Sequence, residues 1–143
     1  MLQNCLLKYI NSHKNPKELK IKNRIHHVGL AVKDVAEVAR FWETVFGAEL
    51  TDYEMETPEF YSRILSIGQG LFELLEPRGK NGLIERFLEN NGEGIHHVSV
   101  NVENLEQVLA ICKEKGIRLL GDRFIHPKSA HGVLIELIGD GEA

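Results

Sequence analysis

Several features that define special protein classes are scarce or missing in this chain of 143 residues. It has two cysteines, Cys5 and Cys112, which are too few and too far apart for a disulfide framework, so we expect reduced thiols in a cytosol-like compartment. No apolar stretch approaches the length needed to span a membrane. The net charge of −4 gives no basis for a nucleic-acid-binding face. What remains is a globular chain of ordinary composition, 43% hydrophobic and 27% charged.

A chain of this length fits one domain, or two small modules that share a core. Residues 1–24 differ from the rest, because they carry six Lys or Arg and a single acid, Glu18. The segment has some likeness to a mitochondrial leader, but its single Arg favours a solvated tail or a short appended helix. We therefore expect an N-terminal extension over 1–24 and one folded domain over 25–143. The expected location is the cytoplasm, or the mitochondrial matrix if the extension is a leader.

A short repeat is the most informative feature of the sequence. Ile-His-His-Val occurs at 25–28 and again at 95–98, and each copy is followed downstream by an apolar-Glu-Leu step, at 72–74 and at 135–137. The same order of a histidine and a carboxylate in both halves indicates a duplicated module. Two such modules facing each other would bring two imidazoles and two carboxylates to one point, which is the donor set of a divalent-metal site.

The first module, residues 25–78, is expected to fold as β-α-β-β-β. Its opening strand, 25–32, is followed by Asp34, which can cap a helix that Gly47 ends. The later strands are expected at about 48–54, 60–67 and 70–76.

The second module, residues 95–138, repeats this order after a short linking helix at 82–90. Its strand opens at Ile95, and Asn104 can cap a helix that Gly116 ends. Short strands are expected near 117–120, 123–126 and 132–138. The fold class is therefore α+β.

Strand parity separates the two histidines of each copy. In a regular strand, neighbouring side chains face opposite sides. His27 and His97 share their faces with small or polar residues, whereas His26 and His96 share theirs with the β-branched residues that should cover the helices. We therefore expect His27 and His97 to point away from the apolar core, and His26 and His96 to point towards it or its margin.

The two carboxylates lie inside apolar strand segments. Glu73 is part of LFELL and Glu136 is part of VLIELI, and a buried carboxylate is costly without a charge partner. A dication bound by both would supply that partner. A single histidine in a strand is commonly a hydrogen-bonded core residue, and a single glutamate commonly faces solvent. Matching order and parity in both copies favour the metal site over this simpler explanation.

These residues resemble the vicinal-oxygen-chelate superfamily of glyoxalases, bleomycin resistance proteins and dioxygenases. The resemblance is closest to its methylmalonyl-CoA epimerase branch, with glyoxalase I as a relative. The segments that carry it are IHHVGLAV, FELLEP, IERFLENNGEGIHHVSVNV and HPKSAHGVLIEL. It implies a glyoxalase-like fold, in which paired βαβββ modules curve into a cup-shaped mixed sheet with a metal at its base. The family's ligand positions fall on His27, Glu73, His97 and Glu136, for one octahedral Co²⁺, Mn²⁺, Ni²⁺ or Zn²⁺ ion with two open positions.

The resemblance also implies an isomerase that epimerises methylmalonyl-CoA, or a similar 2-methyl acyl-CoA thioester, by proton exchange through a metal-stabilised enolate. Glu136 matches one of the family's two acid/base carboxylates as well as a ligand position. The second should lie near the start of the third strand, where the alignment places Tyr61, a poor base at neutral pH. Glu59 lies two residues earlier on the same strand face. A displaced base, a Tyr-assisted variant and a lost activity all stay open.

The stretch 121–129 is shorter than the loop that precedes the His-Pro-Lys-Ser turn in family members. Lys128 in this turn is a candidate contact for a phosphate of coenzyme A, and its ordinary interpretation is a solvated lysine. The alternative functions are a glyoxalase I-type lactoylglutathione lyase and a non-catalytic protein that binds a small ligand or metal. We expect a homodimer through an exposed sheet edge, and no nucleic-acid or membrane partner.

Overall fold

The computed structural model describes residues 23–142. Most of the expected N-terminal extension, with Cys5 and the basic residues up to Lys22, lies outside the described residues. The division into an extension over 1–24 and one domain over 25–143 stays a prediction. Cys112 is a buried free thiol on a helix. Among the described helices, none is both long enough and apolar enough to cross a membrane.

The first half of the described chain follows the expected order of elements. Its helix is capped as predicted, because the Asp34 carboxylate accepts a hydrogen bond from the Glu37 amide, and Gly47 ends the helix in the left-handed conformation (φ 65°). The elements are β1 (Asn23–Ala31), α2 (Val35–Phe46), β2 (Glu49–Glu56), β3 (Phe60–Ile67) and β4 (Gly70–Pro77).

The second half repeats this order with shorter outer strands. The Asn104 side chain accepts from the Gln107 amide and so begins its helix, as expected. Its two outer strands have only two residues each, and they are joined by the tight turn at 121–123. The elements are α3 (Leu83–Asn91), β5 (Gly94–Val102), α4 (Leu105–Glu114), β6 (Leu119–Leu120), β7 (Phe124–Ile125), a single-turn helix η1 (Pro127–Ser129) and β8 (Ile135–Gly139).

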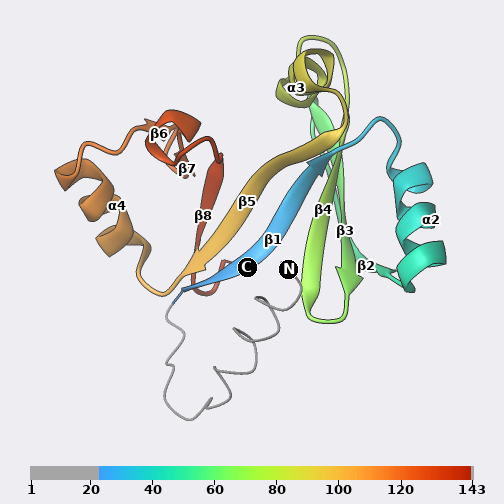
Figure 1. The fold of residues 1–143 in the computed structure, drawn as a ribbon, viewed down its shortest axis with the longest axis horizontal. Coiled ribbons are helices and arrows are strands. Elements are labelled where there is room, and N and C mark those ends of the chain that lie inside the picture. Colours follow the sequence, from blue (N-terminus) through green and yellow to red (C-terminus); the bar gives the residue numbers. More distant parts are fainter. Residues whose placement is uncertain (1–22, 143) are drawn as a thin grey trace, which may run out of the picture.

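All eight described strands form one mixed, curled sheet in the order β2-β3-β4-β1-β5-β8-β7-β6 (Figure 1). The two histidine-bearing strands, β1 and β5, pair antiparallel at its centre, and each pairs parallel with the last strand of its own half, β4 or β8. Helices α2 and α4 lie on the outer sides of the two halves (Figure 1). This arrangement confirms the α+β class and the paired βαβββ modules.

The central pairing has a two-fold register. Val28 pairs with Val98, and around this point every contact occurs twice. His27 pairs with Ser99, and Gly29 pairs with His97. Equivalent residues of the two modules lie 70 positions apart, so His27 corresponds to His97 and Gly29 to Ser99. The two pairs are therefore equivalent contacts with the modules exchanged, as in a symmetric dimer interface.

Two apolar clusters hold the first half of the sheet. Helix α2 covers one face, where Val35 and Ala39 pack on Leu65 and Leu74. On the other face, Ile84 of α3 packs on Ala31 and Leu75. Leu74 and Leu75 are neighbours on β4, so they show directly that the sheet buries apolar side chains on both faces. The face that carries Ala31 and Leu75 is the one on which the candidate site lies.

We expect Leu65→Ala to lower the free energy of unfolding by about 2–5 kcal/mol, because Leu65 is fully buried (0% exposed) and its truncation leaves a cavity. The matched control is Leu83→Ala at the start of α3, where the side chain is 51% exposed and the loss should stay below about 1 kcal/mol. Urea denaturation of both variants measures the difference. Equal losses would contradict this description of the core.

Candidate functional site

The sheet register brings four candidate ligands together from four strands. His27 lies on β1 and His97 on β5, and the central pairing sets them side by side. Glu73 on β4 is paired in register with Gly29, and Glu136 on β8 is paired with Ser99. Each carboxylate therefore lies on the strand next to a histidine-bearing strand, two positions beyond the histidine. The duplicated spacing seen in the sequence thus produces a duplicated geometry.

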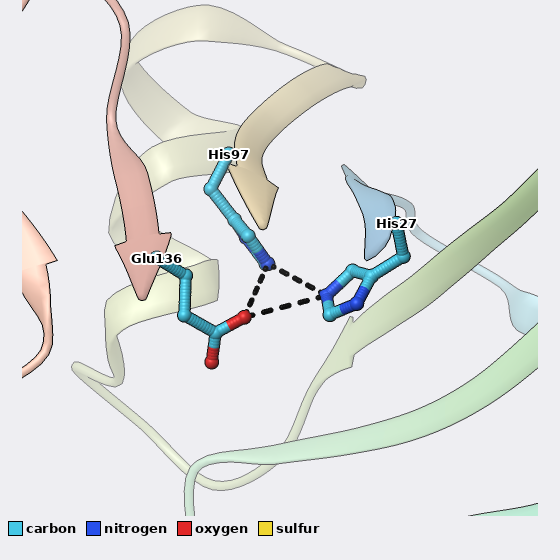
Figure 2. Close-up of side chains that lie close together, drawn as sticks. All are labelled: His27, His97 and Glu136. Atoms are coloured by element: carbon cyan, nitrogen blue, oxygen red, sulfur yellow. Dashed lines mark hydrogen bonds and ion pairs between the residues drawn. The ribbon is translucent and has the colours of Figure 1, made fainter. Parts of the chain in front are cut away.

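The polar tips of the four side chains converge. His27 Nε2 lies 3.2 Å from His97 Nε2. Glu73 Oε2 lies 3.2 Å and 3.5 Å from these two nitrogens, and Glu136 Oε2 lies 3.4 Å and 3.6 Å from them. Figure 2 shows His27, His97 and Glu136 pointing towards one another from separate strands. His27, His97 and Glu73 are 6%, 4% and 8% exposed, so three of the four groups are buried.

Three of these atoms fit a shared divalent cation. Ligand atoms about 2.0–2.2 Å from one ion at tetrahedral angles lie about 3.4 Å apart, and the distances among His27 Nε2, His97 Nε2 and Glu136 Oε2 span 3.2–3.6 Å. Glu136 Oε2 is buried with no hydrogen-bond partner within the described chain. Two imidazoles with carboxylates suit Zn²⁺, Co²⁺, Ni²⁺ or Mn²⁺.

The four groups are not equally close. His27, His97 and Glu136 offer ligand atoms that all lie within 4.8 Å of one another, and Glu73 is outside this compact set. Glu73 nevertheless approaches both ring nitrogens as closely as Glu136 does. On these distances Glu73 remains the fourth candidate ligand. The assignment of all four as metal ligands stays a prediction.

Both carboxylates are held in the ionised form. Burial alone would raise the pKa of Glu73, but hydrogen bonds from His27 and Ser62 and the charges of the two histidines lower that pKa below its ordinary value. Burial would likewise raise the pKa of Glu136, and interactions with His97, Ser99 and His27 lower it. At neutral pH both carboxylates are therefore ionised and can attract a cation.

The prediction that His26 and His96 point towards the apolar core or its margin is confirmed for His96, which packs against Phe87 at the edge of an apolar cluster, and is wrong for His26, which borders an open cavity. The central pairing is irregular between Ile25 and His27 and again between Gly29 and Leu30, so His26 and His96 occupy β-bulges. The bulges turn their rings towards those of the following histidines: the two Nδ1 atoms are 2.8 Å apart in the first pair and 3.0 Å in the second. Burial, together with the charge of His97, lowers the pKa of His96 to about 4.

Two cavities adjoin the cluster. The larger, about 390 Å³, is lined by Thr51, Tyr53 and Met55 of β2, by Glu136 of β8 and by His26. The smaller, about 120 Å³, is mainly apolar and reaches His97. Its remaining lining includes Phe60, Leu75, Leu83, Ile84 and Phe124. The cluster thus lies where a small polar molecule with an apolar part can reach it.

The structure does not bring Glu59 or Tyr61 to this cluster. Tyr61 packs on the α2 side of the sheet, under Arg78, and its hydroxyl donates to Glu54. The exposed Glu59 accepts a hydrogen bond from the Leu83 amide. Strand parity is the reason, because β3 presents Ser62, not its neighbours Tyr61 and Arg63, to the cluster side. This geometry does not support the catalytic role predicted for either residue.

Sequence reasoning missed Ser62 and Tyr53. Ser62 is fully buried and its hydroxyl donates to Glu73 at 2.6 Å. Burial and the charges of Glu73 and Glu136 raise the pKa of Tyr53. Alternation along β3 could have identified Ser62, whereas Tyr53 lies in the stretch between Leu50 and Glu54 where the β2–β3 register is irregular. Lys128 is exposed on η1 and lines neither of the two cavities beside the cluster, so its contact with coenzyme A stays a prediction.

Comparison with known proteins gives a family and a fold. Residues 26–135 match the model of the glyoxalase/bleomycin resistance protein/dioxygenase superfamily. The chain is 32% identical to human mitochondrial methylmalonyl-CoA epimerase, over 80% of this chain and 72% of the relative. It is 33% identical to the ethylmalonyl-CoA/methylmalonyl-CoA epimerase of Cereibacter sphaeroides, over 80% of this chain and 96% of the relative.

The fold is also similar to those of solved methylmalonyl-CoA epimerase structures. Methylmalonyl-CoA epimerase from Mycobacterium tuberculosis superposes with a TM-score of 0.73 and 27% identity, covering 80% of this chain and 86% of that protein. A methylmalonyl-CoA epimerase in complex with methylmalonyl-CoA and NH₄⁺ gives a TM-score of 0.75 with 28% identity, covering 83% and 95%. These similarities confirm the glyoxalase-like fold.

Gly29 supplies a test of the site. A Cβ atom at this position would lie 2.8 Å from Nε2 of His97 and closer still to two other atoms of the ring. We expect Gly29→Ala to displace the His97 ring and to weaken Zn²⁺ or Co²⁺ binding about 10-fold or more. The control is Gly94→Ala on β5, where an added Cβ meets nothing within 4 Å. Competition with a chromophoric chelator measures both affinities, and equal affinities would contradict the proximity of His97 to Gly29.

Proposed function

The chain belongs to the glyoxalase/bleomycin resistance protein/dioxygenase superfamily, and from this membership we propose that it epimerises methylmalonyl-CoA or a similar 2-methyl acyl-CoA thioester. Relatives about 30% identical over most of the chain carry the epimerase name, which supports an epimerase-like enzyme. The observation that carries the proposal is the cluster of two imidazoles and two carboxylates beside a cavity of about 390 Å³. The experiment that tests it is exchange of the substrate's α-proton with solvent.

The proposed chemistry removes a proton from the carbon between a thioester and a carboxylate and returns it on the opposite side. Loss of this proton places negative charge on the thioester oxygen. A divalent cation held by His27, His97, Glu136 and Glu73 would supply Lewis-acid stabilisation of that charge. The chain itself must hold the cation's ligands, orient the acyl group and move the proton.

Glu136 is the proposed proton acceptor on one side. One of its carboxylate oxygens faces the two ring nitrogens, and the other points away from them (Figure 2). Its side chain lines both cavities and is 26% exposed, so a bound molecule can reach it. Its lowered pKa keeps it ionised at neutral pH and ready to accept a proton.

Tyr53 is the proposed proton carrier on the other side. It lies on β2, across the larger cavity from Glu136 on β8. Two other titratable groups that line this cavity outside the cluster are already engaged: Glu142 with Arg123 and the Gly139 amide, and His26 with His27. A phenol is protonated at neutral pH, and burial with the charges of Glu73 and Glu136 raises the pKa of Tyr53 further, so it carries a proton that it can donate.

We expect the Co²⁺-loaded protein to introduce deuterium at the α-carbon of methylmalonyl-CoA in D₂O, and chelator treatment to abolish the exchange. Glu136→Gln should slow it by about 100-fold or more, because it removes a proton acceptor and weakens a ligand. Mass spectrometry of the thioester measures both rates.

Gln107→Glu, at the start of α4, is a control of opposite charge change and should exchange at the wild-type rate. Metal binding without exchange would contradict the epimerase. In that case, thiol-dependent consumption of methylglyoxal would select a lactoylglutathione lyase. Absence of both reactions would select a protein that only binds a ligand or metal, for which the two-residue strands β6 and β7 provide some support.

We expect Tyr53→Phe to affect the rate of proton exchange and the rate of net inversion differently. Proton exchange from one enantiomer should continue, while net inversion falls by about 100-fold, because the proton can no longer return on the opposite side. Deuterium incorporation and a stereospecific assay of the product measure the two rates. Tyr61→Phe is the matched control, since Tyr61 lies on the α2 side of the sheet, and both of its rates should stay normal. Equal loss of exchange and inversion in Tyr53→Phe would contradict this role.

A further inference from the structure

The same irregularity occurs in both halves of the central pairing, immediately before each candidate ligand. Along β1 and β5, Ile25 pairs with Val100 and the next pair is His27 with Ser99, which leaves His26 without a partner. At the equivalent place, Gly29 pairs with His97 and the next pair is Leu30 with Ile95, which leaves His96 without one. Two bulges at equivalent positions indicate a feature that belongs to the site.

The bulges create a contact that a regular strand forbids. Neighbouring side chains on a regular strand point to opposite faces. Here the Nδ1 atoms of His26 and His27 lie 2.8 Å apart, and those of His96 and His97 lie 3.0 Å apart. The two rings of each pair meet edge to face, at interplanar angles of 79° and 89°. Each candidate ligand therefore has a second imidazole on its far side.

In each histidine pair, the proton count determines which Nδ1 atom donates the hydrogen bond. A nitrogen-to-nitrogen hydrogen bond needs one donor and one acceptor. Nε2 of His27 and of His97 faces the cluster, and a cation there requires the lone pair of that nitrogen. The proton of each neutral ligand ring then resides on Nδ1, which donates to the Nδ1 lone pair of the preceding histidine.

We propose that His26 and His96 are positioning residues that hold His27 and His97 in the Nδ1–H tautomer, with Nε2 open towards a shared divalent cation. The inference rests on the metal site of the proposed function and does not require epimerase activity. It assigns a role to both histidines of each Ile-His-His-Val copy.

The two positioning histidines have different surroundings. His96 also meets the Phe87 ring edge to face, with the ring centres 4.9 Å apart, and it adjoins the smaller cavity. His26 adjoins the larger cavity. Because Phe87 restrains one ring and an open cavity borders the other, we expect the larger effect from substitutions of His96.

The direct test is a two-bond nitrogen–proton NMR correlation on the metal-free wild-type protein, which reports the tautomer of each histidine. We expect His27 and His97 to carry their proton on Nδ1. Predominant Nε2–H tautomers at both would overturn the inference, and this measurement depends on no variant.

Variants test the consequence for binding. Asn places an oxygen near the position of Nδ1 and can accept the hydrogen bond, whereas Leu has similar bulk and cannot. We expect His96→Leu to weaken Zn²⁺ binding about 10-fold or more and to mix the tautomers of His97, and His96→Asn to stay within about 3-fold of wild type. The same comparison at His26 gives a second test if His96→Leu fails to fold. His131→Asn, in an exposed turn with φ 54°, is the control for the substitution itself.

The outcomes separate this inference from the proposed function. Equal loss of affinity in the Asn and Leu variants, or no loss in either, would overturn the positioning role. A wild-type protein that binds no divalent cation would overturn it as well. The expected tautomers and affinities without α-proton exchange would support the positioning role while contradicting the epimerase.

Discussion

The antiparallel pairing of β1 with β5 is the constraint on which the rest of the molecule depends. It joins the two halves of the sheet, and it sets His27 beside His97 although 70 residues separate them. Each of these strands pairs in parallel with the strand that carries its carboxylate. A shift of one residue in the central register would turn the histidines to the opposite faces of their strands. The site is therefore a property of strand register, and no loop of the described chain is needed to assemble it.

The charges and hydrogen-bonding groups of the two histidines and two glutamates explain why this cluster suits a bound cation. Two carboxylates at the junction are desolvated, and their interactions with the imidazoles and with the Ser62 hydroxyl keep them ionised. The two ring nitrogens face each other at 3.2 Å and cannot both donate to each other. A dication removes this conflict, because it accepts the lone pairs of both nitrogens, and it also balances the charge of the carboxylates. The same excess of negative charge is what the proposed proton transfer uses, since Glu136 remains ionised.

The fold and the four-residue cluster were predictable because they follow from periodicity and repetition. Element boundaries set by Asp34 and Gly47 follow from local capping chemistry, which acts over a few residues. The bulges were not predictable, since an extra residue in one strand is defined only by the register of its partner. The face occupied by Tyr61 was not predictable for a related reason, because a displacement of one position along a strand moves a side chain to the other face. Roles that depend on which face a side chain occupies therefore needed the structure.

The repeated contacts around Val28 and Val98 have a further consequence. An interface in which each pair recurs with its members exchanged is what two identical half-length chains would form on self-association. Joining the halves covalently makes their encounter intramolecular and independent of protein concentration. The two halves of one chain also need not have the same sequence, so one half can acquire substitutions while the other stays unchanged. Gly29, which leaves room for the His97 ring, and its counterpart Ser99, together with the abbreviated β6 and β7, show that this divergence has occurred.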